Sequence, residues 1–264
     1  MLILFPASIL DPKSPDEEFL EQYHQFQSMG FTTALYSKDE FLSGRATIRG
    51  IVKSKVVLYR GWMLDPEEYS LLCQTIEVAG GSALIPQDMY LATHHLPNWY
   101  PLLKEFTPQT IFATESDDLE SILSKLNWGS YFVKDFVKSL KTGMGSRLDN
   151  AGNVRNLLDS LRQYRGKIEG GICIRQFEEF EAESEKRYFV MNHRPYAAKE
   201  IEEIPALVKV AAERIQSSFF SVDLVRRKDG IDRIVEIGDG QVSDIVGWSA
   251  KRFAETLRDA FRKT

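Results

Sequence analysis

The sequence is poor in the residues that build disulfide-linked or metal-bound scaffolds. Its 264 residues include two cysteines, Cys73 and Cys173, and four histidines. Both cysteines lie within apolar runs, and the histidines show no metal-ligand spacing. We therefore expect buried, reduced cysteines, a reducing compartment and, by default, a cytoplasmic location.

Long apolar runs and an excess of basic charge are also lacking. No stretch approaches 18 apolar residues, so we expect no membrane span. The apolar start, MLILFPASIL, has no basic leader and is interpreted as a first strand instead of a signal peptide. With 33 basic and 38 acidic residues, the net charge is −5, which argues against a nucleic-acid partner. A P-loop, a Gly-x-Ser-x-Gly elbow and a kinase His-Arg-Asp motif are all absent.

The first part of the chain alternates between strand and helix patterns. Strands are expected at 2–5, 31–36 and 55–60, with helices between and after them, the second of which carries Tyr69, Leu72 and Ile76 at helical spacing. This alternation favours a small α/β layer. The aromatic segment 86–101 is interpreted as a connector with short helical turns. We place a domain boundary near residue 105, which gives an N-terminal domain 1–105 and a second domain 106–264.

The second part mixes strands and helices. Strands are expected at 109–114, 130–136, 172–177 and 187–192, and helices at 117–126, 152–165, after Pro205 and at 248–262. Two further strands, 219–227 and 231–239, flank 228-KDG-230, where Asp-Gly is a strong hairpin signal.

Carboxylates gather on this expected hairpin. Asp223 lies on one strand, Glu236 on its partner and Asp239 just beyond it. If Asp223 and Glu236 project to one side, a hard cation such as Mg²⁺ would relieve their repulsion. The exact register stays open because a bulge can intervene. The alternative is a strand edge whose acids simply meet water.

Lysines and glycines follow the strand at 130–136. Lys134 and Lys138 precede a loop that contains Gly143 and Gly145. Lysine charge and close backbone approach at glycine suit a triphosphate. The alternative is a flexible basic surface loop.

Two further segments carry polar groups. The strand 172-ICIRQF-177, if one edge is free, could offer backbone groups to an adenine, with Glu178 or Glu179 near a ribose. The alternative is a plain strand and acidic turn. Arg187 and Arg194 suit phosphate or carboxylate through their guanidinium forks, or else form surface salt bridges.

The order of these motifs resembles the ATP-grasp fold. The likeness covers about residues 106–264 and is carried most closely by 58-LYRGWML-64, 131-YFVKDFVKS-139 and 235-VEIGDGQVSD-244. These stretches resemble a divergent clade that includes uncharacterised bacterial and phage proteins and a eukaryotic assembly factor for a translation initiation factor. The resemblance implies an α/β N-terminal domain followed by an α+β ATP-grasp module of two lobes, with ATP held between the lobes.

The resemblance also implies roles for individual residues. It assigns Lys134 and Lys138 to the ATP phosphates, Arg187 to the γ-phosphate and acyl group, and Asp223 and Glu236 to the metal. The adenine hinge and the ribose contact would be formed by 174–177, which includes Arg175, Gln176 and Phe177, and by Glu178 and Glu179. The chain departs from the family pattern in two places. Gly238 stands where many members have the asparagine of Glu-x-Asn, with Asp239 next as a substitute ligand, and the glycine loop is short.

The function that this resemblance implies is ATP- and Mg²⁺-dependent joining of a carboxylate to an amine, on a peptide, protein or amino-acid-like substrate. The alternative is an ATP-binding assembly factor with little or no turnover, and a phosphotransferase ranks third. The expected partners are ATP and an unknown acid and amine, with no nucleic acid and no membrane. Arg60 ends a strong strand, where α/β sheets place ligand groups, so we expect it to face a cleft and hold a substrate carboxylate, or else to form a surface salt bridge. Arg194 is a second candidate for substrate contact.

Overall fold

A parallel sheet begins the chain. The computed structural model describes residues 1–43, 48–50, 53, 55–137 and 146–261. Three strands run parallel around β1, with β2 and β4 as its neighbours, and β5 continues the parallel order beyond β4. The strand order is β3-β2-β1-β4-β5, with the short β3 antiparallel at one edge. The bounds of these strands are β1 Leu2–Pro6, β2 Thr32–Tyr36, β3 Ile48–Arg49, β4 Val56–Tyr59 and β5 Ser82–Ala83.

Helices follow these strands, as the alternating sequence pattern predicts. The first four are α1 Leu20–Ser28, after the short 3-10 helix η1 Glu17–Phe19, α2 Lys38–Leu42, α3 Pro66–Val78 and α4 Gln87–His94. Local sequence fixes where α3 begins. Asp65 and Glu68 form a capping box there, and Pro66 occupies the first turn, where its missing N–H costs nothing.

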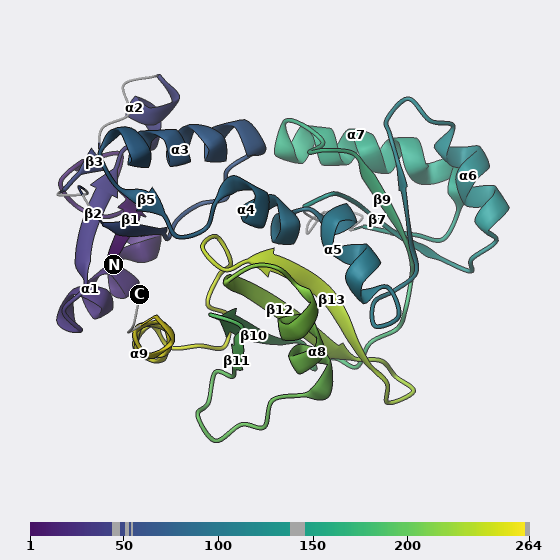
Figure 1. Cartoon of the computed structure of the whole chain (residues 1–264). Coiled ribbons are helices and arrows are strands. Elements are labelled where there is room, and N and C mark those ends of the chain that lie inside the picture. The colour runs from purple at the N-terminus through teal and green to yellow at the C-terminus, as the bar shows by residue number, and fades with distance from the viewer. Residues whose placement is uncertain (44–47, 51–52, 54, 138–145, 262–264) are drawn as a thin grey trace. The chain divides into compact units, whose positions relative to one another are not determined.

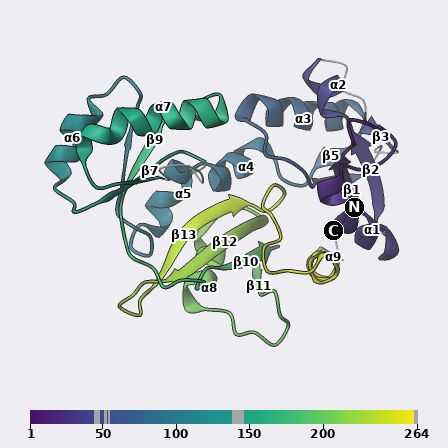
Figure 2. The ribbon, with the colours of Figure 1, turned by 180° about the vertical axis from the view of Figure 1, so that it is seen from behind.

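A second sheet is wholly antiparallel and has the order β6-β9-β7-β8. Its strands are β6 Thr110–Ala113, β7 Tyr131–Asp135, β8 Arg147–Leu148 and β9 Ile172–Gln176. Three helices and one 3-10 helix accompany them, α5 Leu96–Leu103, α6 Leu119–Leu126, η2 Ala151–Asn153 and α7 Val154–Arg165. Both α6 and α7 lie over one face of this sheet (Figures 1 and 2). That face is apolar, and the opposite face is therefore left for other groups.

A third sheet has the order β11-β10-β12-β13. The last elements are β10 Lys186–Met191, β11 Arg194–Tyr196, α8 Ala206–Arg214, β12 Phe219–Arg226, β13 Asp232–Asp239 and α9 Ala250–Ala260. The turn between β12 and β13 confirms the Asp-Gly hairpin prediction. Arg227 N–H donates to Ile231 O at 2.8 Å, and Gly230 has the positive φ, 86°, that this turn requires.

The described chain divides into two compact units. Unit 1 comprises Met1–Ala92, Lys186–Val222 and Gly238–Thr264, and unit 2 comprises Thr93–Glu185 and Asp223–Ile237. The division passes through α4, β12 and β13. The predicted boundary near residue 105 is based on sequence pattern, and it stays a prediction.

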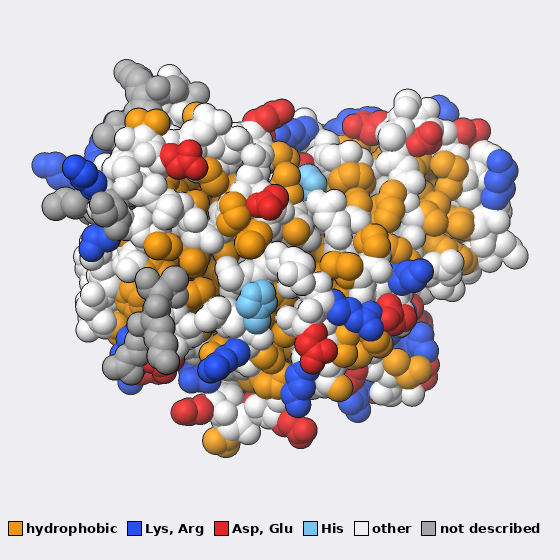
Figure 3. Space-filling view, viewed as in Figure 1, with side chains coloured by type: hydrophobic (Ala, Val, Ile, Leu, Met, Phe, Trp, Pro, Cys, Tyr) orange, Lys and Arg blue, Asp and Glu red, His pale blue; other side chains and the backbone are white. Residues whose placement is uncertain are grey.

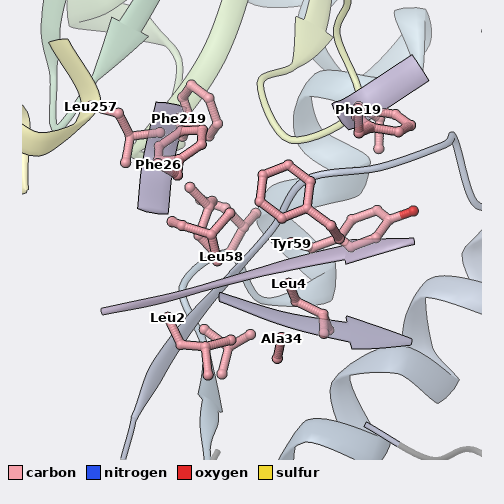
Figure 4. Packing of buried hydrophobic residues seen from close by; sticks show 14 of the residues in the cluster. Leu2, Leu4, Phe19, Phe26, Ala34, Leu58, Tyr59, Phe219 and Leu257 are labelled. Carbon is pink, nitrogen blue, oxygen red and sulfur yellow. The ribbon is translucent and has the colours of Figure 1, made fainter. Parts of the chain in front are cut away.

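The core of unit 1 joins segments that are distant in sequence. Leu2 and Leu4 of β1 and Leu58 of β4 belong to the same buried cluster as Phe219 and Leu257 (Figure 4). Aromatic pairs such as Phe189 with Phe253, with ring centroids 5.0 Å apart, lie in the same cluster.

The core of unit 2 is smaller. It packs apolar side chains of α6 and α7 against one face of the antiparallel sheet, and its fully buried members include Leu123, Val133, Leu157, Ile172 and Ile174. No helix among the described residues has both the length and the apolar character needed to cross a bilayer. On the face shown in Figure 3, basic and acidic side chains are intermixed, as the nearly balanced composition predicts.

Candidate nucleotide and metal site

Unit 2 presents a cationic face on its antiparallel sheet. Lys134 of β7 lies directly opposite Cys173 of β9, and Phe132 lies opposite Arg175. Because directly paired residues share a face, Lys134 and Arg175 project to the same side, away from the apolar face under α6 and α7. Both side chains are 5% exposed, so two cations are largely withdrawn from water on one side of the sheet.

Arg175 connects this face to strand β13. Its Nη1 donates to Val235 O at 2.7 Å and its Nη2 donates to Thr107 Oγ1. Burial lowers the pKa of the guanidinium to about 10, and nearby acids, Glu236 among them, oppose that shift. The buried Nε atom has no hydrogen-bond partner among the described residues. The sequence-based prediction gave Arg175 a backbone role at an adenine hinge, whereas the structure shows a buried side chain that reaches the neighbourhood of Glu236.

Cys173, between these two cations, is not a nucleophile. Burial raises the pKa of its thiol to about 12, although Lys134 and Arg175 act in the opposite direction. A thiol with so high a pKa stays protonated at neutral pH, and covalent thiol chemistry is therefore not expected on this face.

The two strands of the hairpin differ in length by one residue. Near the turn Arg227 pairs with Ile231, and at the far end Gly240 N–H donates to Phe219 O at 3.1 Å. Between these two pairs β13 has one residue more than β12, as in a β-bulge. Ile234 and Ile237 are both buried although they are three residues apart, which regular alternation does not allow. We therefore locate the bulge between them, at Val235 and Glu236.

The bulge brings the two predicted metal ligands to one side of the sheet. Ser221 Oγ lies 3.4 Å from Gly238 O, so Ser221 and Gly238 are neighbours across the strands. Asp223 is two residues beyond Ser221, and Glu236 is two residues before Gly238, so both project to that same side. Asp223 is 2% exposed and Glu236 is partly exposed. This arrangement supports the predicted pairing of these two carboxylates.

Asp239 has a different setting, in unit 1. Its side chain is buried, and its Oδ1 accepts from the backbone N–H of Gln241 at 3.0 Å and from Gln241 Nε2 at 3.1 Å. Its backbone carbonyl accepts from Ser243 N–H and from Ser243 Oγ. These bonds make Asp239 the residue that shapes the turn 239–243. Within the described ranges, no three His, Cys, Asp or Glu side chains come together as a metal site. The role of Asp239 as a third ligand stays a prediction.

Strand β9 does not have the free edge on which the adenine prediction depended. It lies between β6 and β7 and is paired with both. Gln176 N–H donates to Gln109 O and Phe177 N–H donates to Ser130 O. The expectation of a free edge is therefore wrong over Ile172–Gln176, because a local sequence pattern does not show how many neighbours a strand will have.

The acidic exit of β9 is also engaged. Glu178 accepts from Arg233 Nε at 2.9 Å and from Arg233 Nη2 at 2.8 Å, and its side chain is 9% exposed. Glu179 is exposed and pairs with Lys228. An open pocket of about 470 Å³ lies at this exit, lined by Tyr100, Lys104, Glu105, Thr107, Gln109, Gln176, Glu178, Arg227 and Arg233. Gln176 and Glu178, both predicted to contact the nucleotide, thus line one pocket.

The remaining predicted residues belong to unit 1 or lie outside the described ranges. Arg187 of β10 is partly exposed and its Nη1 donates to Asp244 O at 2.9 Å. Arg194 of β11 is exposed, next to the tight turn at Asn192 and His193, both of which have positive φ. Lys138, Gly143 and Gly145 lie outside the described residues.

Arg60 requires a correction. It is 1% exposed and lies in the interior of unit 1 instead of facing an open cleft. Its Nε donates to Gln22 Oε1 at 2.7 Å, and its Nη1 donates to the backbone carbonyls of Gln241 and Ser243. The prediction failed because the segment that covers Arg60 is about 180 residues away in sequence.

The family can now be decided from the sequence match over the residues that form this site. The model of the ATP-grasp domain, clade family 3, matches residues 109–257. The chain belongs to this ATP-grasp family. The predicted superfamily and fold class are thereby confirmed, with an α/β N-terminal part and an ATP-grasp module. No curated protein matches the sequence.

Solved structures show the same fold over nearly the whole ATP-grasp chain. The D-cycloserine synthetase DcsG has a TM-score of 0.67 and 11% identity, covering 98% of this chain and 99% of its own. D-alanyl-alanine synthetase A from Vibrio cholerae O1 biovar eltor str. N16961 has a TM-score of 0.65 and 13% identity, covering 100% and 99%. The ATP-grasp ligase PsnB, in complex with minimal precursor, Mg and ADP, has a TM-score of 0.60 and 12% identity, covering 99% and 98%. At such identities these likenesses show the fold alone.

The departure at Gly238 has a packing reason. A Cβ atom at this position would lie 2.8 Å from Ser243 Oγ and 3.0 Å from Ser221 Oγ. These two hydroxyls are 2.8 Å apart and hydrogen-bonded to each other. The serine pair therefore fills the space that the side chain of the usual asparagine would need.

We expect Gly238→Asn, which installs the family's usual residue, to destabilise the protein by about 1–3 kcal/mol through overpacking. Thermal unfolding by calorimetry measures the change. Removing the two hydroxyls in the same chain, with Ser221→Ala and Ser243→Ala, should recover part of the loss. Wild-type stability of Gly238→Asn would contradict the packing argument.

Proposed function

We propose that this ATP-grasp chain is an ATP-dependent ligase that joins a carboxylate to an amine through an acyl phosphate, on a peptide or amino-acid-like substrate. The main support is the arrangement in unit 2, where the buried cations Lys134 and Arg175 share one sheet face and Arg175 reaches strand β13 beside Glu236. This arrangement suits an anionic nucleotide near a divalent cation, because phosphate charge would be offset by lysine and arginine.

The residues present fit Mg²⁺ and ATP. Asp223 and Glu236 offer the hard oxygen ligands that Mg²⁺ prefers, and this ion commonly takes only one or two carboxylates when phosphates and waters supply the rest. The unpartnered Nε of Arg175 is a buried donor on the same side of the sheet, and a bound anion would satisfy it. Bound Mg²⁺ would neutralise charge on the phosphate oxygens.

The chain's own side chains have positioning and electrostatic roles in this proposal. The substrate carboxylate attacks the γ-phosphorus, the bond to the ADP oxygen breaks, and the amine then displaces phosphate from the acyl group. Lys134 holds phosphate charge at a site withdrawn from water, where a fixed cation acts more strongly than in solvent. Arg187 stabilises the transferred phosphoryl group, in the role that the resemblance implies. No general base is required from the described residues.

The substrate class is supported by the relatives. PsnB is described in complex with a precursor peptide, and two other structures of the same fold belong to synthetases of small amino-acid-like molecules. We therefore propose a peptide or an amino-acid-like acid as the carboxylate donor for this chain.

A trapping experiment tests the proposal. The protein is incubated with ATP, Mg²⁺ and pools of amino acids and peptides, with hydroxylamine added to intercept an acyl phosphate. We expect ADP and a hydroxamate in equal amounts with one pool. Tight Mg·ATP binding without ADP release in every pool would contradict ligase activity and favour an ATP-binding assembly factor.

A matched pair of variants tests the metal assignment. We expect Glu236→Gln to weaken Mg·ATP binding by at least about tenfold, because it removes one charged oxygen ligand of the ion. The control is Glu213→Gln on the exposed surface of α8, which removes the same charge elsewhere. Binding is measured by calorimetry with and without Mg²⁺. Equal affinity of Glu236→Gln and wild type would remove Glu236 from the metal site.

A further inference from the structure

Two of the stretches that carry the family resemblance, 58–64 and 235–244, are hydrogen-bonded to each other inside unit 1. Arg60 Nη1 donates to Ser243 O at 2.6 Å, to Gln241 O at 2.9 Å and to Gly240 O at 3.4 Å. The backbone adds a further contact, since Gly61 N–H donates to Gln241 O at 3.2 Å. One guanidinium group thus holds successive carbonyls of the turn that follows β13.

Gln241 completes this connection from the other side. Its Oε1 accepts from Tyr59 N–H at 3.2 Å, and its Nε2 donates to Tyr69 Oη at 2.7 Å and to Asp239 Oδ1 at 3.1 Å. Both donors and the acceptor of this amide are therefore used within a residue that is 1% exposed. A fully satisfied buried polar network of this kind fixes one local conformation.

The buried charge of Arg60 is stabilised on several sides. Its guanidinium carbon lies 5.1 Å from the ring centroid of Phe253 and 5.8 Å from that of Phe19. Burial lowers the pKa of Arg60 to about 10, with the charges of Asp244 and Asp239 opposing that shift. The group remains charged at neutral pH, so the turn is held by charge-assisted hydrogen bonds, which are stronger than neutral ones.

The clamped turn leads directly to Arg187. Asp244 follows Ser243, and its backbone carbonyl accepts from Arg187 Nη1 at 2.9 Å. The backbone carbonyl of Arg187 in turn accepts from Trp248 Nε1 at 3.0 Å. Moving the carbonyls of 241–244 would therefore move an acceptor of the Arg187 guanidinium.

We propose that Arg60 and Gln241 are positioning residues, which clamp the turn 239–244 and through Asp244 hold the guanidinium of Arg187 in place. The consequence for turnover rests on the proposed function, whereas the clamp itself rests on hydrogen bonds within unit 1. Arg60 is then a strand-end residue that acts on the protein's own backbone instead of on a substrate.

Three variants test the clamp. Arg60→Lys keeps the charge but loses the fork, Arg60→Met loses both, and Arg258→Met is the control, because Arg258 is 43% exposed on α9 and bonds to its neighbour Asp259. Hydrogen exchange followed by mass spectrometry reports on the amides of 240–245. We expect exchange there to accelerate at least about tenfold in Arg60→Met, less in Arg60→Lys, and not in Arg258→Met. Wild-type exchange in a folded Arg60→Lys and Arg60→Met would overturn the clamp.

Two further readouts separate positioning of Arg187 from general stability. The indole N–H resonance of Trp248, assigned with Trp248→Phe, should shift in Arg60→Lys and stay in place in Arg258→Met. If turnover is found, Arg60→Lys should lower kcat while leaving the KM for ATP within about twofold, because only an interaction with the transferred group is displaced. Faster exchange together with an unchanged Trp248 resonance and an unchanged kcat would overturn the link to Arg187. The exchange and resonance measurements stand even if no substrate pool yields ADP, so failure of the ligase proposal is distinguishable.

Discussion

Lys134→Met is expected to lower kcat/KM for ATP-dependent turnover by about 100- to 1,000-fold, the loss typical when one preorganised charge-stabilising group is removed. The lysine is 5% exposed on the central region of the antiparallel sheet, on the face that it shares with Arg175. Solvent screening is weak at such a site, so the missing charge is not replaced by water. Methionine has a similar length and no charge, and it should preserve the packing of β7 against β9.

The matched control is Lys125→Met, which removes a lysine exposed in the last turn of α6 in the same unit. We expect its turnover to equal that of wild type. Circular dichroism and thermal unfolding should show that the Lys134→Met protein is folded, since burying methionine in place of an ammonium group removes a desolvation cost. Full turnover by a folded Lys134→Met protein would exclude Lys134 from the phosphate site.

Gly240→Ala is expected to destabilise the protein by about 3 kcal/mol or more, through a steric clash in a packed core. A Cβ atom at Gly240 would lie 2.5, 2.6 and 2.7 Å from three ring atoms of Phe219. Phe219 is 0% exposed and has Phe189 and Phe253 as aromatic neighbours, at centroid distances of 5.9 and 6.1 Å. The ring has no room to retreat, so the turn 239–243 or the core must shift.

Differential scanning calorimetry measures this effect, and a loss of that size corresponds to a fall in Tm of about 6–12 °C for a chain of this length. Gly129→Ala is the control, because a Cβ there meets nothing within 4 Å. Its stability should stay within about 0.5 kcal/mol of wild type. Phe219→Leu in the Gly240→Ala background should recover part of the loss. An unchanged Tm for Gly240→Ala would show that the core is looser than its contacts indicate.

Elements with a strong local pattern could be predicted from sequence. The apolar run at β1, the helical spacing in α3 and the Asp-Gly turn between β12 and β13 each contain their own signal, and the structure has all three. The short strands β3, β5 and β11 were missed. They have two or three residues each and exist because a neighbouring strand supplies their hydrogen bonds.

The site shows the same division. Lys134, Asp223 and Glu236 could be selected because charge inside an apolar strand is unusual in any sequence. The burial of Arg60 and the two-sided pairing of β9 could not be foreseen, because both depend on partners distant along the chain. The one-residue bulge in β13 was left open as a possibility, and it is what turns Glu236 toward the side of Asp223. Gln241 was overlooked within a quoted motif, although a glutamine flanked by glycine and valine after two acids is a signal of a buried amide.

The composition of unit 1 has a consequence for the order of folding during synthesis. Its core requires Leu2 and Leu4 from the first strand together with Phe253 and Leu257 from the last helix. The first 92 residues can pair their strands early, but they leave apolar surface uncovered until α9 has emerged from the ribosome. Unit 2 lacks only the short segment Asp223–Ile237 once residue 185 has been made. We therefore expect the later-encoded unit to mature first and the earlier-encoded one to wait, in the nascent state, for the end of the chain.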